Sequence, residues 1–148
     1  MREIQQGTVK VAESGSGPYS QLVWAGRHVL SADEPQTRGG HDVGPSPYEY
    51  LSAALGACTA MTLRFYVRRH NWDLRQTIVE VRHEKAVAVG GTPAVDQFYR
   101  TIHLDGDLTD EQRLKLLQIA ESCPVSETLR HSSIVESSLA DVSLSVAA

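Results

Sequence analysis

The sequence predicts an α+β fold in which two main helices pack against an antiparallel sheet of about six strands. Two observations favour this class. Short β-type runs follow one another across tight turns, as in hairpins, and the two segments with helical periodicity do not alternate with single strands as a parallel βαβ fold requires. A chain of 148 residues is large enough to bury its own core without disulfides. We therefore expect one domain over residues 1–148.

The N-terminal region predicts antiparallel strands. Residues 3–12 and 19–31 carry β-type runs, and the small and turn-forming residues of the segment 14–18 separate them. A long loop follows, from about Ala32 to Pro45. Its glycines indicate backbone with special dihedral angles, and an ordered loop of this length in a compact domain is often functional.

A long helix is predicted to begin after Ser46. Ser46 suits the N-cap, Pro47 suits the first helical position, and Glu49 completes an S-x-x-E capping box. Beyond them, side chains at spacings of three and four predict one buried stripe. The stripe consists of Leu51, Ala54, Leu55, Cys58, Met61, Thr62 and Phe65. A cysteine on such a stripe is either an unreactive core residue or a functional one.

A hairpin is predicted after this helix. Ile78 to Val89 alternates as a long, half-exposed strand, and the segment 90–93, which reads GGTP, turns the chain. In the strand that follows, Phe98, Ile102 and Leu104 supply the inward face.

The C-terminal part predicts a second helix, a short third helix and a last strand. Thr109 and Gln112 form another capping box. The helix that they open ends near Cys123. Pro124 suits the first position of a new helical turn, which places Cys123 at its N-cap. The strict alternation from Val142 to Val146 predicts the last strand.

Composition excludes several classes of function. A formal charge of −4 argues against a dedicated nucleic-acid binder. The sequence has no apolar run long enough to span a membrane and no signal-peptide pattern at its start. Its six histidines show no zinc-binding spacing, and no nucleotide-binding glycine motif follows a strand. We expect a cytoplasmic protein that binds no nucleic acid, membrane, metal or organic cofactor.

The two cysteines raise the question of thiol chemistry. A thiol with the ordinary pKa of about 8.5 is mostly protonated at neutral pH, so a reactive cysteine needs a cation, a helix N-terminus or hydrogen bonds. By this criterion Cys123, at an N-cap, is better placed than Cys58 in the middle of a helix. Both positions also suit an unreactive cysteine, as a small core residue or an ordinary connector.

Two strings resemble the OsmC/Ohr family of thiol-dependent hydroperoxide reductases. They are GGHDVGPSPYEYLSAALGACTAMT, which a DEP motif precedes, and SCPVSETL. The resemblance implies a single OsmC-like domain and an intertwined homodimer with the two long helices at its centre. It also implies that Cys58 is oxidised by a small-molecule hydroperoxide to a sulfenic acid, and that Cys123 then closes a Cys58–Cys123 disulfide. Electrons would come from an external dithiol or a thioredoxin- or lipoyl-type donor.

The resemblance further implies an arginine that activates Cys58. Glu49 matches the family glutamate that would hold this guanidinium as a bidentate pair. Arg38, reaching from the partner subunit, is our candidate for the arginine, and Arg27 is the competitor. After the second cysteine the sequence departs from its relatives, because Ser126 and Glu127 stand where His and Lys are expected.

A non-enzymatic function is the alternative. An OsmC-like dimer with an apolar pocket would bind a hydrophobic small molecule, with Cys58 as a passive wall and Tyr48, Tyr50 and Phe65 as lining. The two hypotheses differ in one geometric requirement. The enzyme needs its two cysteines close enough to form a disulfide, whereas the binding protein does not.

Overall fold

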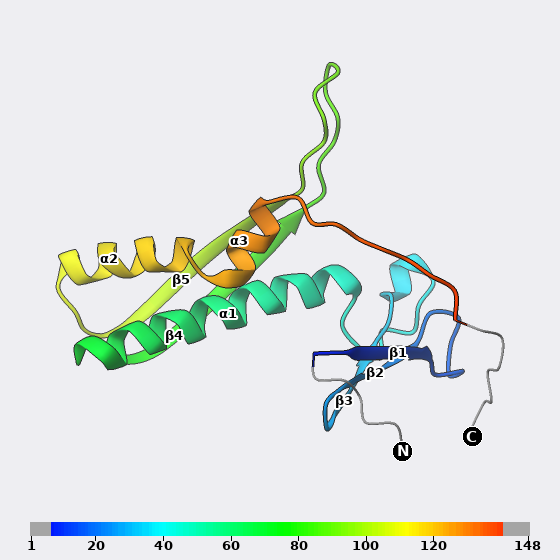
Figure 1. Cartoon of the computed structure of the whole chain (residues 1–148), viewed down its shortest axis with the longest axis horizontal. Helices are drawn as coiled ribbons and strands as arrows, with labels where there is room; N and C mark the ends of the chain where they lie inside the picture. The colour runs from blue at the N-terminus through cyan, green and yellow to red at the C-terminus, as the bar shows by residue number, and fades with distance from the viewer. Residues whose placement is uncertain (1–6, 141–148) are drawn as a thin grey trace.

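The computed structural model describes residues 7–140 and confirms the α+β class (Figure 1). In this range the chain forms two antiparallel sheets, of three strands and of two, together with three α-helices and one 3-10 helix. The predicted strand from Val142 to Val146 lies outside the described residues. The elements are β1 (Val9–Glu13), β2 (Gln21–Ala25), β3 (His28–Ala32), η1 (Gln36–Arg38), α1 (Pro47–His70), β4 (Asp73–Glu84), β5 (Gln97–Asp107), α2 (Asp110–Glu121) and α3 (Pro124–Arg130).

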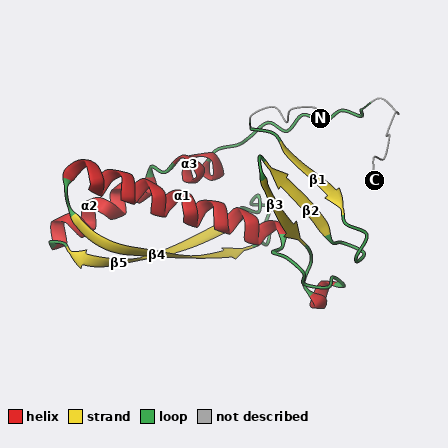
Figure 2. Ribbon diagram, turned by 90° about the horizontal axis from the view of Figure 1, so that it is seen from below, coloured by secondary structure: helices red, strands yellow, loops and turns green. Residues whose placement is uncertain are grey.

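The first sheet is an antiparallel meander in the order β1-β2-β3. The predicted β-type runs within 19–31 form the two strands β2 and β3, because Gly26 adopts a φ of 59° and turns the chain between Ala25 and His28, which pair with each other. This sheet lies beside the N-terminal end of α1, apart from the helices and the second sheet (Figures 1 and 2).

The second sheet is the hairpin of β4 and β5, and α1, α2 and α3 lie on one of its faces (Figure 2). The hairpin was predicted, but its first strand begins at Asp73 and ends at Glu84. The carboxylate of Asp96 accepts the backbone N–H of Ala86 at 3.0 Å, so a side chain replaces the next hydrogen bond of the ladder. The predicted end of the strand, with Val87 and Val89, therefore belongs to a loop that projects from the body (Figure 1).

The core lies between α1, α2 and the hairpin. Its buried residues are Leu63, Val67, Leu74, Leu108, Leu116 and Ala120. On α1 the buried positions recur every four residues, at Leu55, Thr59, Leu63 and Val67. This line of side chains faces the elements that pack on α1, which are β4, α2 and α3.

The predicted stripe of α1 is wrong for most of its members in the single chain. Leu55 is buried, but Leu51, Met61 and Phe65 are 42%, 69% and 65% exposed. Both lines have spacings that are compatible with a helix, every four residues for the line that contains Thr59 and three and four for the exposed line. The chain's own elements cover the line that contains Thr59. Cys58 belongs to the line of Met61 and Phe65 and is half-buried.

None of the helices within residues 7–140 is long and apolar enough to cross a membrane.

Candidate thiol site

The start of α1 is fixed by the capping box that the sequence predicts. The backbone N–H of Ser46 donates to Oε2 of Glu49 at 2.7 Å, and the N–H of Glu49 donates to the Ser46 hydroxyl at 3.4 Å. Pro47 occupies the first helical position. These contacts satisfy N–H groups that the first turn of a helix leaves without partners.

The glycine-rich loop before α1 is organised around a buried carboxylate. Asp33 is only 3% exposed. It accepts hydrogen bonds at 2.8–3.3 Å from the Ser20 hydroxyl and from the backbone N–H groups of Glu34, His41 and Val43. Gly40 is required by packing, since a Cβ at this position would lie 1.9 Å from the carbonyl oxygen of Glu34. The loop is therefore a scaffold that positions the first turn of α1.

Asp33→Asn is expected to destabilise the protein at pH 7 and to lose its effect in acid. Burial raises the pKa of Asp33, but the hydrogen bonds that it accepts outweigh burial and lower the pKa below its ordinary value. A lowered pKa contributes stability above the unfolded pKa of about 3.9, and this stability is lost as the pH falls through the folded pKa. Thermal unfolding of wild type and Asp33→Asn from pH 7 to pH 3 measures the difference.

The exposed Asp42 of the same loop offers the control for this experiment. Asp42 adopts a φ of 55°, which asparagine tolerates well, so Asp42→Asn should leave the pH dependence unchanged. If the melting temperatures of wild type and Asp33→Asn differed by the same amount at every pH, the stabilising role of the Asp33 carboxylate would be contradicted.

The fold brings the two cysteines together. Cys58 lies in the middle of α1, and Cys123 is the N-cap of α3, as the sequence predicts. Because α3 packs against α1, the Cys58 thiol lies near Cys123, close enough to help lower the pKa of the Cys123 thiol. Cys123 is 0% exposed, whereas Cys58 is half-buried. Both are free thiols.

A buried arginine completes this cluster. Arg100 lies on the inward face of β5, and its side chain is 9% exposed. Its Nη1 donates to the Thr59 hydroxyl at 2.9 Å and lies 3.8 Å from Sγ of Cys123. Its Nη2 donates to the Glu121 carboxylate at 3.3 Å. Sequence reasoning missed this residue, although a charged side chain between the inward-facing Phe98 and Ile102 was a signal that could have found it.

The surroundings of Cys123 favour its thiolate. Burial raises the pKa of this thiol, and four interactions lower it. They are the hydrogen bonds from the Ser126 N–H, the Thr59 hydroxyl and the Cys58 thiol, and the positive charge of Arg100. Together they leave the pKa of Cys123 below its ordinary value.

The other predicted site residues do not join the cluster within one chain. Arg38 lies in η1 with its side chain 71% exposed, and its Nη1 is 4.0 Å from Oε2 of Glu34. Arg27 lies in the exposed turn between β2 and β3. Glu49 serves the capping box, and no arginine of the described chain forms an ion pair with it.

The two residues that depart from the relatives lie on different sides of α3. Ser126 is buried and donates its backbone N–H to Sγ of Cys123 at 3.4 Å. The carboxylate of Glu127 is half-exposed and lies 3.9 Å from Arg130 and 3.8 Å from His131. The acidic charge at Glu127 therefore pairs with basic side chains of its own helix and C-cap.

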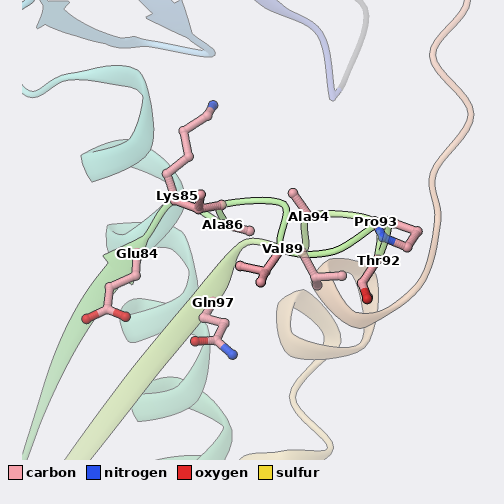
Figure 3. A pocket seen from close by; sticks show the side chains of 10 residues that line it. Glu84, Lys85, Ala86, Val89, Thr92, Pro93, Ala94 and Gln97 are labelled. Atoms are coloured by element: carbon pink, nitrogen blue, oxygen red, sulfur yellow. The ribbon is translucent and has the colours of Figure 1, made fainter.

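The aromatic residues considered as pocket lining lie apart. Tyr48 stacks on His83 with ring centroids 4.4 Å apart, and Tyr50 hydrogen-bonds to the carbonyl oxygen of Ser31. Phe65 is exposed on another line of α1. A hollow of about 610 Å³ lies at the projecting loop between β4 and β5 (Figure 3), and its lining includes no cysteine. Within residues 7–140 no group of three or more His, Cys, Asp or Glu side chains could hold a metal ion.

Comparisons with known proteins identify the family and the fold. Residues 39–138 match the family model described as OsmC-like protein. No curated relative matches the sequence. Among solved structures, an OsmC-like protein from Mycoplasma pneumoniae superposes with a TM-score of 0.70 at 12% identity, covering 83% of this chain and 86% of its own. An osmotic stress induced and detoxification response protein from Psychrobacter arcticus gives 0.69 at 19% identity, with coverage of 86% and 90%.

A third solved structure carries a name that bears on chemistry. It is an organic hydroperoxide resistance protein OsmC from Legionella pneumophila, with a TM-score of 0.63, 19% identity and coverage of 83% of this chain and 89% of its own. At these identities the structural similarity shows a shared fold.

Proposed function

Since the chain belongs to the OsmC-like protein family, we propose that it is a thiol-dependent peroxidase that reduces organic hydroperoxides to alcohols. The name of the Legionella structure supports this class of substrate. The observation that carries the proposal is the proximity of Cys58 and Cys123, which the packing of α3 on α1 brings together. A peroxidase that closes a disulfide requires two adjacent thiols, whereas a ligand-binding dimer does not.

The first step is the oxidation of Cys58, the more accessible of the two cysteines. Its thiolate attacks the terminal oxygen of the hydroperoxide and breaks the O–O bond. Two electrons pass from sulfur to the peroxide, and the departing alkoxide takes up a proton to become the alcohol. Cys58 is left as a sulfenic acid.

The second step is the resolution of this sulfenic acid by Cys123. The lowered pKa of Cys123 supplies a thiolate next to Cys58. This sulfur attacks the Cys58 sulfur, and the hydroxide that leaves becomes water on protonation. The product is the Cys58–Cys123 disulfide, which an external dithiol or a thioredoxin- or lipoyl-type donor reduces. A cytoplasmic location suits this cycle, because reductants of that class are kept reduced there.

Activation of Cys58 is assigned to a second copy of the chain. We place Arg38 of the partner subunit beside Cys58, with Glu49 holding its guanidinium, and Arg27 as the competing arginine. Two observations support this arrangement. The Arg38 side chain is exposed, and the capping box engages only Oε2 of Glu49, which leaves the other carboxylate oxygen for a guanidinium.

The dimer itself is supported by the exposed face of α1. Leu51, Ala54, Cys58, Met61 and Phe65 recur at spacings of three and four, the pattern by which two helices pack along a seam. Leu51, Met61 and Phe65 are large apolar side chains exposed in the single chain. Burial of this seam in a homodimer would place Cys58 in an apolar, desolvated site, which favours organic hydroperoxides over hydrogen peroxide.

The proposal is tested by counting free thiols and measuring intact mass before and after one equivalent of cumene hydroperoxide. The expected result is rapid loss of both thiols and of two hydrogen atoms, with one equivalent of the alcohol. Cumyl alcohol added in place of the hydroperoxide is the control and should change neither quantity. Thiols that survive minutes of exposure would contradict the peroxidase and favour the ligand-binding dimer.

A further inference from the structure

The two sulfurs of the proposed disulfide lie in unequal surroundings. Cys123 is 0% exposed and lies 3.8 Å from Nη1 of Arg100, and its sulfur accepts the N–H of Ser126. Cys58 is half-buried, and no arginine within residues 7–140 hydrogen-bonds to it. Within one chain, an entering molecule therefore reaches Cys58 more easily, while the chain's own arginine stabilises negative charge on Cys123.

The guanidinium of Arg100 is held firmly beside Cys123. Nη1 of Arg100 donates to the Thr59 hydroxyl at 2.9 Å, and the oxygen of this hydroxyl lies 2.7 Å from the carbonyl oxygen of Leu55. On the other side Arg100 pairs with Glu121, but the carboxylate of Glu121 also pairs with Arg130. Because two arginines share this carboxylate, the charge of Arg100 is only partly compensated and remains able to stabilise an anion at Cys123.

This asymmetry has a direct consequence for thiol–disulfide exchange. An attacking thiolate displaces the sulfur that leaves as the more stable thiolate, and the new bond forms at the other sulfur. Access within one chain acts in the same direction, because Cys58 is the less buried of the two cysteines and Cys123 is the better leaving group.

We propose that Arg100 stabilises Cys123 as the leaving thiolate of the Cys58–Cys123 disulfide and thereby directs the external dithiol to the sulfur of Cys58. This inference rests on the proposed function only for the existence of the disulfide. The first thiolate of the dithiol bonds to the Cys58 sulfur, the Cys58–Cys123 bond breaks, and its electron pair leaves on Cys123. The second thiolate of the dithiol then attacks the first sulfur of the dithiol and releases Cys58, so the dithiol ends oxidised and both cysteines end reduced.

The test starts from a disulfide made without peroxide. The protein is oxidised with diamide and treated briefly with the monothiol N-acetylcysteine, and acid then quenches the exchange. Peptide mass spectrometry locates the N-acetylcysteine adduct. We expect the adduct on Cys58 to exceed that on Cys123 by about tenfold or more in the wild type, and Arg100→Met to reduce this ratio by about tenfold.

Two variants control for charge and for general loss of an arginine. Arg100→Lys keeps a positive charge and should retain most of the preference for Cys58. Arg82→Met removes an exposed arginine from the neighbouring strand and should leave the ratio unchanged. Should Arg100→Met fail to fold, Glu121→Gln gives the complementary test, since removal of the carboxylate leaves Arg100 less compensated and should increase the preference for Cys58.

A second measurement is the pH titration of the thiolate absorbance of Cys123 in the Cys58→Ser background. If Arg100 had only a structural role, its replacement would not change this titration. Arg100→Met in that background should shift the titration to higher pH. An adduct mainly on Cys123 in the wild type, or a ratio and titration that Arg100→Met leaves unchanged, would overturn the inference, as would failure of diamide to form the disulfide. The protein could also form the disulfide with diamide and direct the probe to Cys58, yet resist oxidation by hydroperoxide. That result would contradict the proposed peroxidase function and support the inference about Arg100.

Discussion

Cys58→Ser is expected to reduce hydroperoxide turnover by at least about a thousandfold, because it removes the nucleophile that breaks the O–O bond. Cys123→Ser is expected to behave differently. It keeps the nucleophile but loses the thiol that resolves the sulfenic acid, so one equivalent of alcohol forms and the cycle then stalls with a dithiol donor that acts on disulfides. The two variants thus separate the oxidation step from the recycling step.

The measurement is alcohol released per protein chain over time, with dimedone to trap the sulfenic acid and mass spectrometry to locate it. Ala57→Ser, which introduces a hydroxyl at an exposed position of α1 next to Cys58, is the matched control and should turn over as the wild type does. Turnover at the wild-type rate in either cysteine variant would contradict the roles assigned here. A dimedone adduct on Cys123 in Cys58→Ser would show that Cys123 is the cysteine that reacts with the hydroperoxide.

The parts of the fold that the sequence predicted rest on residues a few positions apart. Both capping boxes, with Ser46 and Thr109 as their N-caps, and the N-cap at Cys123 are present in the structure. Each depends on hydrogen bonds within a single helical turn, so the residues involved determine the outcome with little help from the rest of the chain. The inward alternation of β5 was predicted from an equally local property, because successive side chains of a strand point to opposite faces of the sheet.

The errors concern contacts between distant segments. The stripe of α1 was misassigned because the lines through Thr59 and through Met61 both fit the period of a helix, and only the packing of β4, α2 and α3 distinguishes them. Arg100 was missed because its contacts join β5 to α1 and to the N-cap of α3. The proposed pairing of Glu49 with Arg38 involves a second copy of the chain, so the single chain leaves it a prediction.

The local analysis favoured Cys123 as the reactive cysteine, whereas the family resemblance favoured Cys58. Local reasoning identified Cys123 as the better-stabilised thiolate, and its pKa is indeed lowered. The resemblance implies that Cys58 meets the peroxide, and Cys58 is the more exposed thiol. A stable thiolate and an accessible nucleophile are different requirements, so two neighbouring cysteines can meet one each.

Phe65→Glu is expected to convert a homodimer into monomers. In the proposed dimer the seam of α1 packs on its own copy, and burial of a side chain such as phenylalanine contributes about 1.5–3 kcal/mol. The substitution removes this contribution twice and brings a carboxylate from each copy into an apolar interface, so we expect dimerisation to weaken at least about a hundredfold. Sedimentation should then give 16.2 kDa where the wild type gives twice that mass.

Gln118→Glu, which adds the same charge at an exposed position of α2, should leave the dimer intact. The monomer formed by Phe65→Glu should also lose peroxidase activity, because Cys58 lies on the same seam and would lose both its desolvated surroundings and the arginine of the partner subunit. A dimeric Phe65→Glu variant would show that the copies meet elsewhere. A monomeric Phe65→Glu variant with full activity would show that a single chain activates Cys58. Arg100, whose Nη1 lies 3.8 Å from Sγ of Cys123, would then be the candidate for the activating cation.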